Sequence, residues 1–272
     1  MPPMPAPQRI VIKIGTGVLT RSDGVRLDES TFVEIARAIA ELHRRGDEVI
    51  LVSSGAVGAG LMEYGRTTRP ESTAGLQAFA AIGQARLMQT WRTHLAIRDL
   101  SAAQLLLTYS DLGSEERRTR ILRTLDALLE LRTVIPIINE NDSVAVEELR
   151  FGDNDALSAH VAAMVGATAL VMLTSVDGLM RETPQGPELV PVVTHLAEAR
   201  AHVRNDKGDL SVGGMQTKLD AVAHTHKAGL PAFIANGKQA WRLPALLDGT
   251  DHTCTHFPLP LNASLTTPAS QP

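Results

Sequence analysis

The sequence contains few aromatic residues, a single cysteine and no long apolar run. Phe, Trp and Tyr make up 3% of the 272 residues, so the core must be built from aliphatic side chains. Cys254 alone cannot form an internal disulfide, which fits a reducing compartment. No segment approaches the roughly 20 apolar residues of a membrane span. The N-terminal MPPMPAPQR lacks the apolar stretch of a signal peptide. We therefore expect a cytoplasmic protein.

The charge balance argues against one class of partner. The net charge is −4 at pH 7, whereas a surface that binds nucleic acid usually appears as an excess of Lys and Arg. The hydrophobic content of 44% and the charged content of 21% are ordinary for a globular protein. We expect neither a nucleic acid nor a membrane as a partner.

Apolar runs of strand length alternate with segments of helical periodicity. Runs such as 9–15 and 169–174 lack polar alternation, which is typical of strands buried on both faces of a parallel sheet. The expected strands are 9–15, 48–55, 101–108, 133–139, 169–174, 230–236 and 252–258, and the expected helices are 28–45, 74–97, 114–131, 155–167, 215–228 and 238–248. This order predicts an α/β fold, a three-layer α/β/α sandwich with a mostly parallel central sheet.

Two segments fit this order less clearly. Residues 189–196 are expected to form an edge strand or a hairpin, and 205–214 a polar loop. No linker divides the chain, so we expect one domain with two lobes over residues 1–260. The segment 261–272 lacks periodicity and is expected to be a flexible tail.

Several common site motifs are missing. No GxxxxGK[ST] occurs, and no GxGxxG follows a strand in a dinucleotide-binding context. Ser-Ser-Gly at 53–55 lacks the full GxSxG pattern of a hydrolase. The histidines and the cysteine lack metal-ligand spacing, so no metal site built from protein side chains is predicted. We expect His224 and His226 to be surface residues.

Lys13 stands inside the apolar run RIVIKIG and is followed at once by Gly-Thr-Gly. A lysine in a buried strand cannot easily reach solvent, so its ammonium group must find an anion. The alternative is an edge strand whose lysine points to water, but the aliphatic residues on both sides argue against it.

Three glycine-containing turns precede or open helices, at 15–17, 53–60 and 211–218. Backbone N–H groups in such turns can bind anions. Two of the turns lie near a lysine, Lys13 or Lys218. Glycine also serves ordinary turns, but together these features favour a phosphate site. Phosphoryl transfer needs charge stabilisation and positioning, which lysines and carboxylates supply.

The segment 139–155, NENDSVAVEELRFGDND, carries six carboxylates and one cation, Arg150. It follows a strand that is expected to be buried, where charge is costly to desolvate. A solvated acidic loop is the simple explanation. The alternation of Asn with acidic residues instead suggests a site that needs both amide and carboxylate groups.

These motifs together resemble the glutamate 5-kinases of the amino acid kinase family over about residues 8–260. The matching stretches are VIKIGTGVLT (11–20), VSSGAVGAG (52–60), INENDSVAVEELRFGDNDALSA (138–159), LTSVDGL (173–179) and GGMQTKLDAV (213–222). The resemblance implies the amino acid kinase fold for residues 1–260, with a glutamate site in the N-terminal lobe and an ATP site in the C-terminal lobe. It also implies phosphorylation of the L-glutamate side-chain carboxylate, the first step of proline biosynthesis. A PUA module, which many members carry, is not expected.

The resemblance also implies roles for single residues. Asp155 would orient the catalytic lysines Lys13 and Lys218, and Asp142 would pair with the ammonium group of glutamate. The implied glutamate-binding residues are Ser54, Gly55, Asn139, Asp142, Asp153 and Asn154. The implied ATP-binding residues are Lys13, Gly15, Thr16, Gly17, Thr174, Ser175, Val212, Gly213, Gly214, Met215, Gln216, Thr217 and Lys218.

The chain departs from the family pattern at two places. Ser175 stands where the family usually has Asp, and Ser211-Val212 where it has Gly-Thr. Both lie in segments implied to contact the nucleotide, so nucleotide affinity or base preference is the property they would affect.

The resemblance further implies ATP and Mg²⁺ as cofactors and a homo-oligomer, a dimer or tetramer. Proline would be a feedback inhibitor, and glutamyl phosphate reductase a partner. The alternatives are another member of the family, an acetylglutamate or aspartate kinase, or a non-catalytic amino-acid sensor of the same fold. A site for a free ammonium group argues against the acetylated substrate, and the presence of both lysines argues against the sensor.

Overall fold

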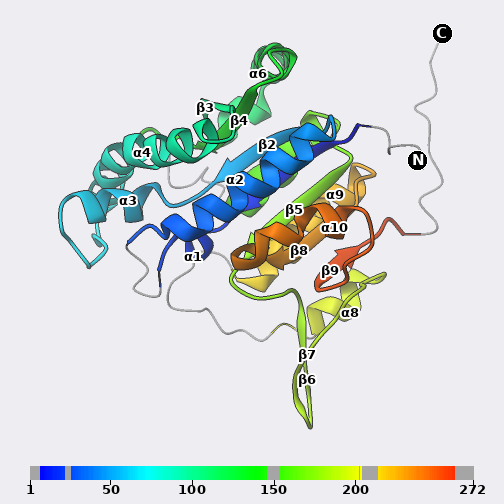
Figure 1. The fold of residues 1–272 in the computed structure, drawn as a ribbon. Helices are drawn as coiled ribbons and strands as arrows, with labels where there is room; N and C mark the ends of the chain where they lie inside the picture. Colours follow the sequence, from blue (N-terminus) through cyan, green and yellow to red (C-terminus); the bar gives the residue numbers. More distant parts are fainter. Residues whose placement is uncertain (1–6, 22–25, 146–153, 202, 204–213, 261–272) are drawn as a thin grey trace.

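The computed structural model describes residues 7–21, 26–145, 154–201, 203 and 214–260. Its centre is a seven-stranded sheet in the order β3-β4-β2-β1-β5-β8-β9 (Figure 1). The strands are β1 Arg9–Ile14, β2 Glu48–Ser53, β3 Ser101–Leu107, β4 Val134–Glu140, β5 Ala169–Thr174, β8 Ala232–Asn236 and β9 Cys254–Phe257. Neighbouring strands pair in parallel except β8 and β9, which are antiparallel. The predicted mostly parallel sheet is confirmed.

Helices cover both faces of the sheet, which confirms the three-layer architecture. The main helices are α2 Glu29–Arg44, α4 Thr73–Ala96, α6 Glu115–Glu130, α7 Asn154–Met164, α9 Met215–Lys227 and α10 Leu243–Leu247, the last preceded by the 3₁₀ helix η2 Gly237–Arg242. One apolar core joins the sheet to α2, α4 and α10, and a second joins it to α6, α7 and α9. None of these helices, nor any other in the described ranges, is long and apolar enough to cross a membrane.

The alternation of side chains along β1 decides which face receives the buried lysine. Ile10, Ile12 and Ile14 belong to the core under α2 and α4, whereas Val11 belongs to the core under α7 and α9. Side chains two apart share a face of a strand, so Lys13 points toward α7 and α9. Because β1 lies between β2 and β5, the edge-strand alternative for Lys13 is wrong.

The order of the strands places the site at one edge of the sheet. From β1 the chain moves to β2 on one side, and after β4 it crosses back to β5 on the other side. In open α/β sheets, ligands bind beyond the carboxyl ends of the strands where the order reverses in this way. Lys13, Ser53, Asn139 and Thr174 all lie at or next to such strand ends.

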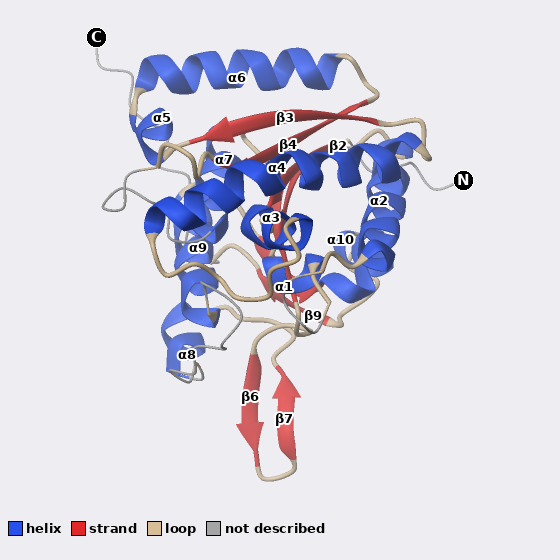
Figure 2. Ribbon diagram, turned by 90° about the vertical axis from the view of Figure 1, so that its left-hand side faces the viewer, coloured by secondary structure: helices blue, strands red, loops and turns tan. Residues whose placement is uncertain are grey.

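Other elements differ from the prediction or add to it. The hairpin consists of β6 Met180–Thr183 and β7 Gly186–Leu189 and projects from the body of the molecule (Figure 2). The hairpin therefore lies before the predicted position, 189–196. Within 189–196 the sheet pairing is an isolated bridge from Val192 to His256. The short helices α1 Thr16–Leu19, α3 Ala56–Glu63, α5 Tyr109–Gly113 and α8 Leu196–Ala201 were not predicted. The loop 205–213 and the tail 261–272 lie outside the described residues.

Helices α3 and α4 pack with their backbones in direct contact. A Cβ atom added to Gly83 would lie 1.8 Å from the carbonyl oxygen of Ala56, and one added to Gly60 would lie 2.0 Å from that of Phe79. Neither position therefore tolerates a side chain without a shift of the helices. This contact fixes α3, which begins directly after Ser54 and Gly55, against α4.

We predict that Gly83→Ala lowers the free energy of unfolding by about 1–3 kcal/mol, the range of an overpacked core. The better helix propensity of alanine, worth up to about 1 kcal/mol, would act in the opposite direction. Denaturant unfolding measures the difference. Gly113→Ala is the matched control, since a Cβ there meets nothing within 4 Å. Equal stability of the two variants would contradict close packing at Gly83.

Helices α7 and α9 meet at a pair of histidines. The rings of His160 and His224 have centroids 4.0 Å apart, and both side chains are partly buried. The expectation that His224 and His226 lie at the surface is therefore wrong in part, since His226 is also half-buried and contacts the Phe257 carbonyl oxygen at 3.2 Å. Burial lowers the pKa of His160 and of His224. The neighbouring His224 also lowers the pKa of His160, and the charge of Lys227 also lowers that of His224.

This pair predicts a loss of stability in mild acid. A histidine with a lowered pKa in the folded state binds fewer protons there than in the unfolded state, whose pKa is about 6.5. The free energy of unfolding should then fall as the pH drops below about 6.5. His224→Gln should flatten this fall in urea unfolding at pH 5.5 and 7.5, whereas the exposed His195→Gln should keep the wild-type slope. Identical slopes for both variants would remove the pair as a cause.

Candidate active site

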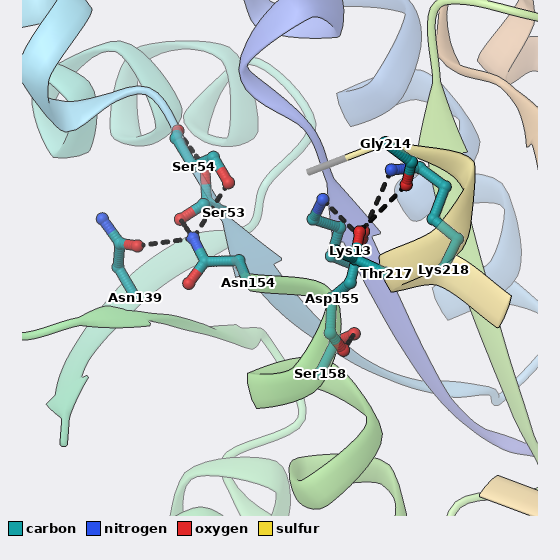
Figure 3. Close-up of polar contacts among 10 residues, drawn as sticks. All are labelled: Lys13, Ser53, Ser54, Asn139, Asn154, Asp155, Ser158, Gly214, Thr217 and Lys218. Carbon is teal, nitrogen blue, oxygen red and sulfur yellow. Dashed lines mark hydrogen bonds and ion pairs between the residues drawn. The ribbon is translucent and has the colours of Figure 1, made fainter. Parts of the chain in front are cut away.

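Asp155, at the start of α7, holds two lysines at the carboxyl end of β1 (Figure 3). Its Oδ1 lies 2.6 Å from Lys13 Nζ, and its Oδ2 lies 3.0 Å from Lys218 Nζ. The three side chains are 0%, 3% and 8% exposed for Asp155, Lys13 and Lys218. The three residues implied to be catalytic thus form one buried cluster with a net positive charge, from three distant parts of the chain.

Hydrogen bonds at the start of α9 hold the carboxylate in place. Thr217 Oγ1 donates to Asp155 Oδ2 at 2.9 Å and lies equally close to the Gly214 carbonyl oxygen. On α7, Ser158 Oγ donates to the backbone oxygen of Asp155 at 2.7 Å. These contacts fix the anion, so the direction of both ammonium groups is set by protein atoms.

Asn154, the residue before Asp155, forms a second cluster with the ends of β2 and β4. Its Nδ2 donates to the backbone oxygen of Ser53 at 3.1 Å, to Ser54 Oγ at 2.9 Å and to Asn139 Oδ1 at 2.8 Å. Its Oδ1 is buried and meets no donor within the described ranges. An unpaired buried acceptor is costly in a folded protein, so this oxygen suits a ligand donor.

Two residues of α4 that the sequence analysis missed support this cluster. Asn139 Nδ2 donates to Gln84 Oε1 at 2.8 Å, and the buried Trp91 Nε1 donates to Ser53 Oγ at 3.1 Å. Gln84 and Trp91 are seven residues apart and so lie on one side of the helix. Gln84 could have been found from the sequence, because it lies on the same side of the helix as the apolar residues Leu87 and Trp91. A polar side chain near a core needs a hydrogen-bond partner.

Two of the remaining residues implied to bind glutamate, Gly55 and Asp142, follow the ends of β2 and β4. Gly55 has φ 102° as the residue before α3, a left-handed conformation that favours glycine. Asp142 is partly buried in the turn that follows β4. Its neighbours Asn141 and Val144 help to line a hollow of about 310 Å³ beside the ends of β3 and β4. Asp153 lies outside the described residues.

The glycines implied to bind ATP show two kinds of local geometry. A Cβ at Gly15 would lie 3.7 Å from Lys13 Nζ, so this backbone runs directly past the ammonium group. A Cβ at Gly17 or Gly214 would meet nothing within 4 Å, and neither residue has a positive φ. Neither the backbone conformation nor crowding therefore requires glycine at these two positions. A ligand that approaches the backbone closely would account for both.

The other described residues implied to contact ATP lie near the same edge. Thr16 begins the short helix α1, Thr174 ends β5 and Ser175 is exposed just beyond it, while Met215 and Gln216 open α9. Asn236, paired with Thr174 in the sheet, donates from Nδ2 to Asp177 Oδ1 at 2.9 Å, a contact that was not predicted. Val212 and Gly213 lie outside the described residues.

The described side chains do not fit a metal ion held by protein alone. No three His, Cys, Asp or Glu side chains gather at one place in the ranges that the structure describes. Both oxygens of Asp155 already face ammonium groups. Mg²⁺ commonly binds through substrate phosphates and water, with few protein ligands. The described residues fit a Mg²⁺ ion that arrives bound to the phosphates of a nucleotide.

This chain matches a family model and several relatives of known name. The model of the amino acid kinase family matches residues 8–236. Glutamate 5-kinase from Thermus thermophilus is 44% identical over 245 residues, which cover 89% of this chain and 65% of the relative. The enzyme from Chromohalobacter salexigens is also 44% identical, with 89% and 64% covered. The chain thus spans just under two thirds of the length of these relatives.

Solved structures share the fold at low sequence identity. Carbamate kinase from Giardia lamblia bound to AMP-PNP superposes with a TM-score of 0.66 at 15% identity, covering 93% of this chain and 99% of that one. Isopentenyl phosphate kinase from T. acidophilum gives 0.63 at 16% identity, with 91% and 99% covered. The family model covers most of the chain and the fold agrees with it, so the chain belongs to the amino acid kinase family.

Proposed function

We propose that this protein transfers the γ-phosphoryl group of ATP to the side-chain carboxylate of L-glutamate, giving L-glutamyl 5-phosphate in the first step of proline biosynthesis. The observation that carries the proposal is the buried Lys13–Asp155–Lys218 cluster at the carboxyl edge of the sheet. Similarity to glutamate 5-kinases supports the choice of glutamate among the substrates of the family.

The chemistry needs few protein groups. The attacking carboxylate is already an anion, so no general base is required. A carboxylate oxygen bonds to the γ-phosphorus while the bond from that phosphorus to the β–γ bridging oxygen breaks, and ADP leaves. Lys13 and Lys218 are the described cations placed to stabilise the charge on the transferred group. Mg²⁺, brought on the nucleotide phosphates, would neutralise further charge.

We assign the amide cluster to the amino-acid substrate. The unpaired oxygen of Asn154 suits the ammonium group of glutamate, and Asp142 would be its ionic partner. Asn139, Ser54 and Gly55 would complete the site, with Asp153 from the adjoining segment. Gly15, Thr16, Gly17, Thr174, Ser175 and residues 212–218 are assigned to ATP.

Partners and location stay predictions from the sequence. We propose a homo-oligomer in the cytoplasm, inhibited by proline, whose ammonium and carboxylate groups could take up part of the glutamate site. The acyl phosphate product is unstable in water, so its transfer to glutamyl phosphate reductase fits the chemistry.

The proposed function predicts acyl phosphate formation with one amino acid above others. Purified protein with ATP, Mg²⁺ and hydroxylamine should yield the hydroxamate of L-glutamate, because hydroxylamine traps acyl phosphates. N-acetylglutamate and aspartate should react far more slowly. Equal or faster turnover with either would reassign the substrate within the family, and no product with any of the three would favour a sensor.

The buried cluster predicts a second result. Lys218→Ala should lower kcat by about a hundredfold or more, the scale of one lost charge contact in a transition state. Glutamate binding measured by calorimetry should change less. Lys227→Ala is the matched control, since Lys227 is exposed at the far end of the same helix. A near-normal kcat for Lys218→Ala would remove this lysine from the mechanism.

A further inference from the structure

Gln84, Asn139 and Asn154 form a chain of three side-chain amides whose direction is fixed by backbone groups. The backbone N–H of Glu140 donates to Asn139 Oδ1 at 2.9 Å, so this end of the Asn139 amide must be the oxygen. The Ser53 carbonyl oxygen lies 3.1 Å from Asn154 Nδ2, so this end of the Asn154 amide must be the nitrogen. An amide placed in the opposite orientation would set donor against donor or acceptor against acceptor.

These constraints determine what each amide presents. Asn154 uses Nδ2 for protein acceptors, so the group that remains is its buried oxygen, an acceptor only. Asn139 uses Oδ1 for two donors, so its Nδ2 needs an acceptor, which is Gln84 Oε1 at 2.8 Å. Gln84 Nε2 is then left buried, with no acceptor in reach among the described residues.

The unpaired Nε2 argues that Gln84 does more than fill space. A buried donor without a partner disfavours the folded state, and an apolar side chain of the same size would avoid this cost. Rotating the Gln84 amide by 180° would not give Nε2 an acceptor, because Nε2 would then face Asn139 Nδ2, which is also a donor. The contact with Asn139 therefore determines the orientation of Gln84.

We infer that Gln84 is a positioning residue, which holds Asn139 so that Asn154 offers its oxygen to the ammonium group of the substrate. This inference rests on the proposed amino-acid substrate. Without the Gln84 acceptor, Asn139 loses the contact that fixes its Nδ2, and its side chain can turn away from Asn154. Asn154 then loses one of its three acceptors and keeps Ser53 and Ser54, so its oxygen is held less firmly in the direction of the ammonium group.

The test compares two substitutions, of which only one keeps an oxygen acceptor for Asn139. Gln84→Met keeps the approximate length of the side chain and removes the acceptor, whereas Gln84→Glu keeps an acceptor at the same place. Gln84→Met should raise the KM for glutamate about three- to tenfold, the loss expected for one hydrogen bond. The KM for ATP should stay within about twofold. Gln84→Glu should restore most of the glutamate affinity.

The exposed Gln89→Met on the same helix is the matched control and should leave both KM values unchanged. Equal rises in both KM values, or no rescue by Gln84→Glu, would reduce Gln84 to a packing residue. Wild-type protein that forms no hydroxamate with glutamate would contradict the proposed function instead.

A measurement that does not need turnover keeps the two outcomes apart. Hydrogen exchange of the Asn139 side-chain amide, followed by NMR and assigned with Asn139→Asp, should become faster in Gln84→Met and stay slow in Gln84→Glu. Unchanged exchange in Gln84→Met would overturn the positioning role whatever the substrate is.

Discussion

The ion pairs from Asp155 to Lys13 and Lys218 are the constraint on which the rest of the site depends. Each lysine comes from an element whose other buried residues are mostly apolar, β1 in one case and α9 in the other. Two ammonium groups near each other repel, and neither is stable in a dry interior without an anion. A single buried carboxylate between them allows both to stay there. It thereby fixes where β1, α7 and α9 meet.

The sequence predicted the parts of this arrangement that are local. Lys13 was recognised because a charge inside a uniformly aliphatic strand has few explanations, and the layers followed from strand and helix periodicity. The pairing of Asp155 with Lys218, 63 residues apart, has no local signal and came from the resemblance alone. The hairpin was misplaced because Leu189–Val193 is more apolar than the exposed strands β6 and β7, whose pairing depends on the turn between them.

Gln84 and Trp91 were missed for a different reason. Helix propensity alone accounts for alanine and glutamine in a long helix. Composition therefore gives no sign that one particular glutamine in it has a specific partner. Their importance appears only once the strand ends are known, because their partners Asn139 and Ser53 lie 55 and 38 residues away. The backbone contact at Gly83 holds α4 against α3, and the next residue, Gln84, contacts Asn139 near the end of β4.

Asn154 and Asp155 divide the site into two halves. Consecutive helical residues point about 100° apart, so one side chain turns to the ends of β2 and β4 and the other to β1 and α9. The contacts described in the first half are made by neutral amides and hydroxyls, which would discriminate a ligand by the direction of donors and acceptors, and the proposed site adds the carboxylate of Asp142. The second half carries two cations and one anion, which favour developing negative charge. Since one helix end carries both, the acceptor and the transferred phosphoryl group would be positioned by a single rigid element, which is the geometry that in-line transfer requires.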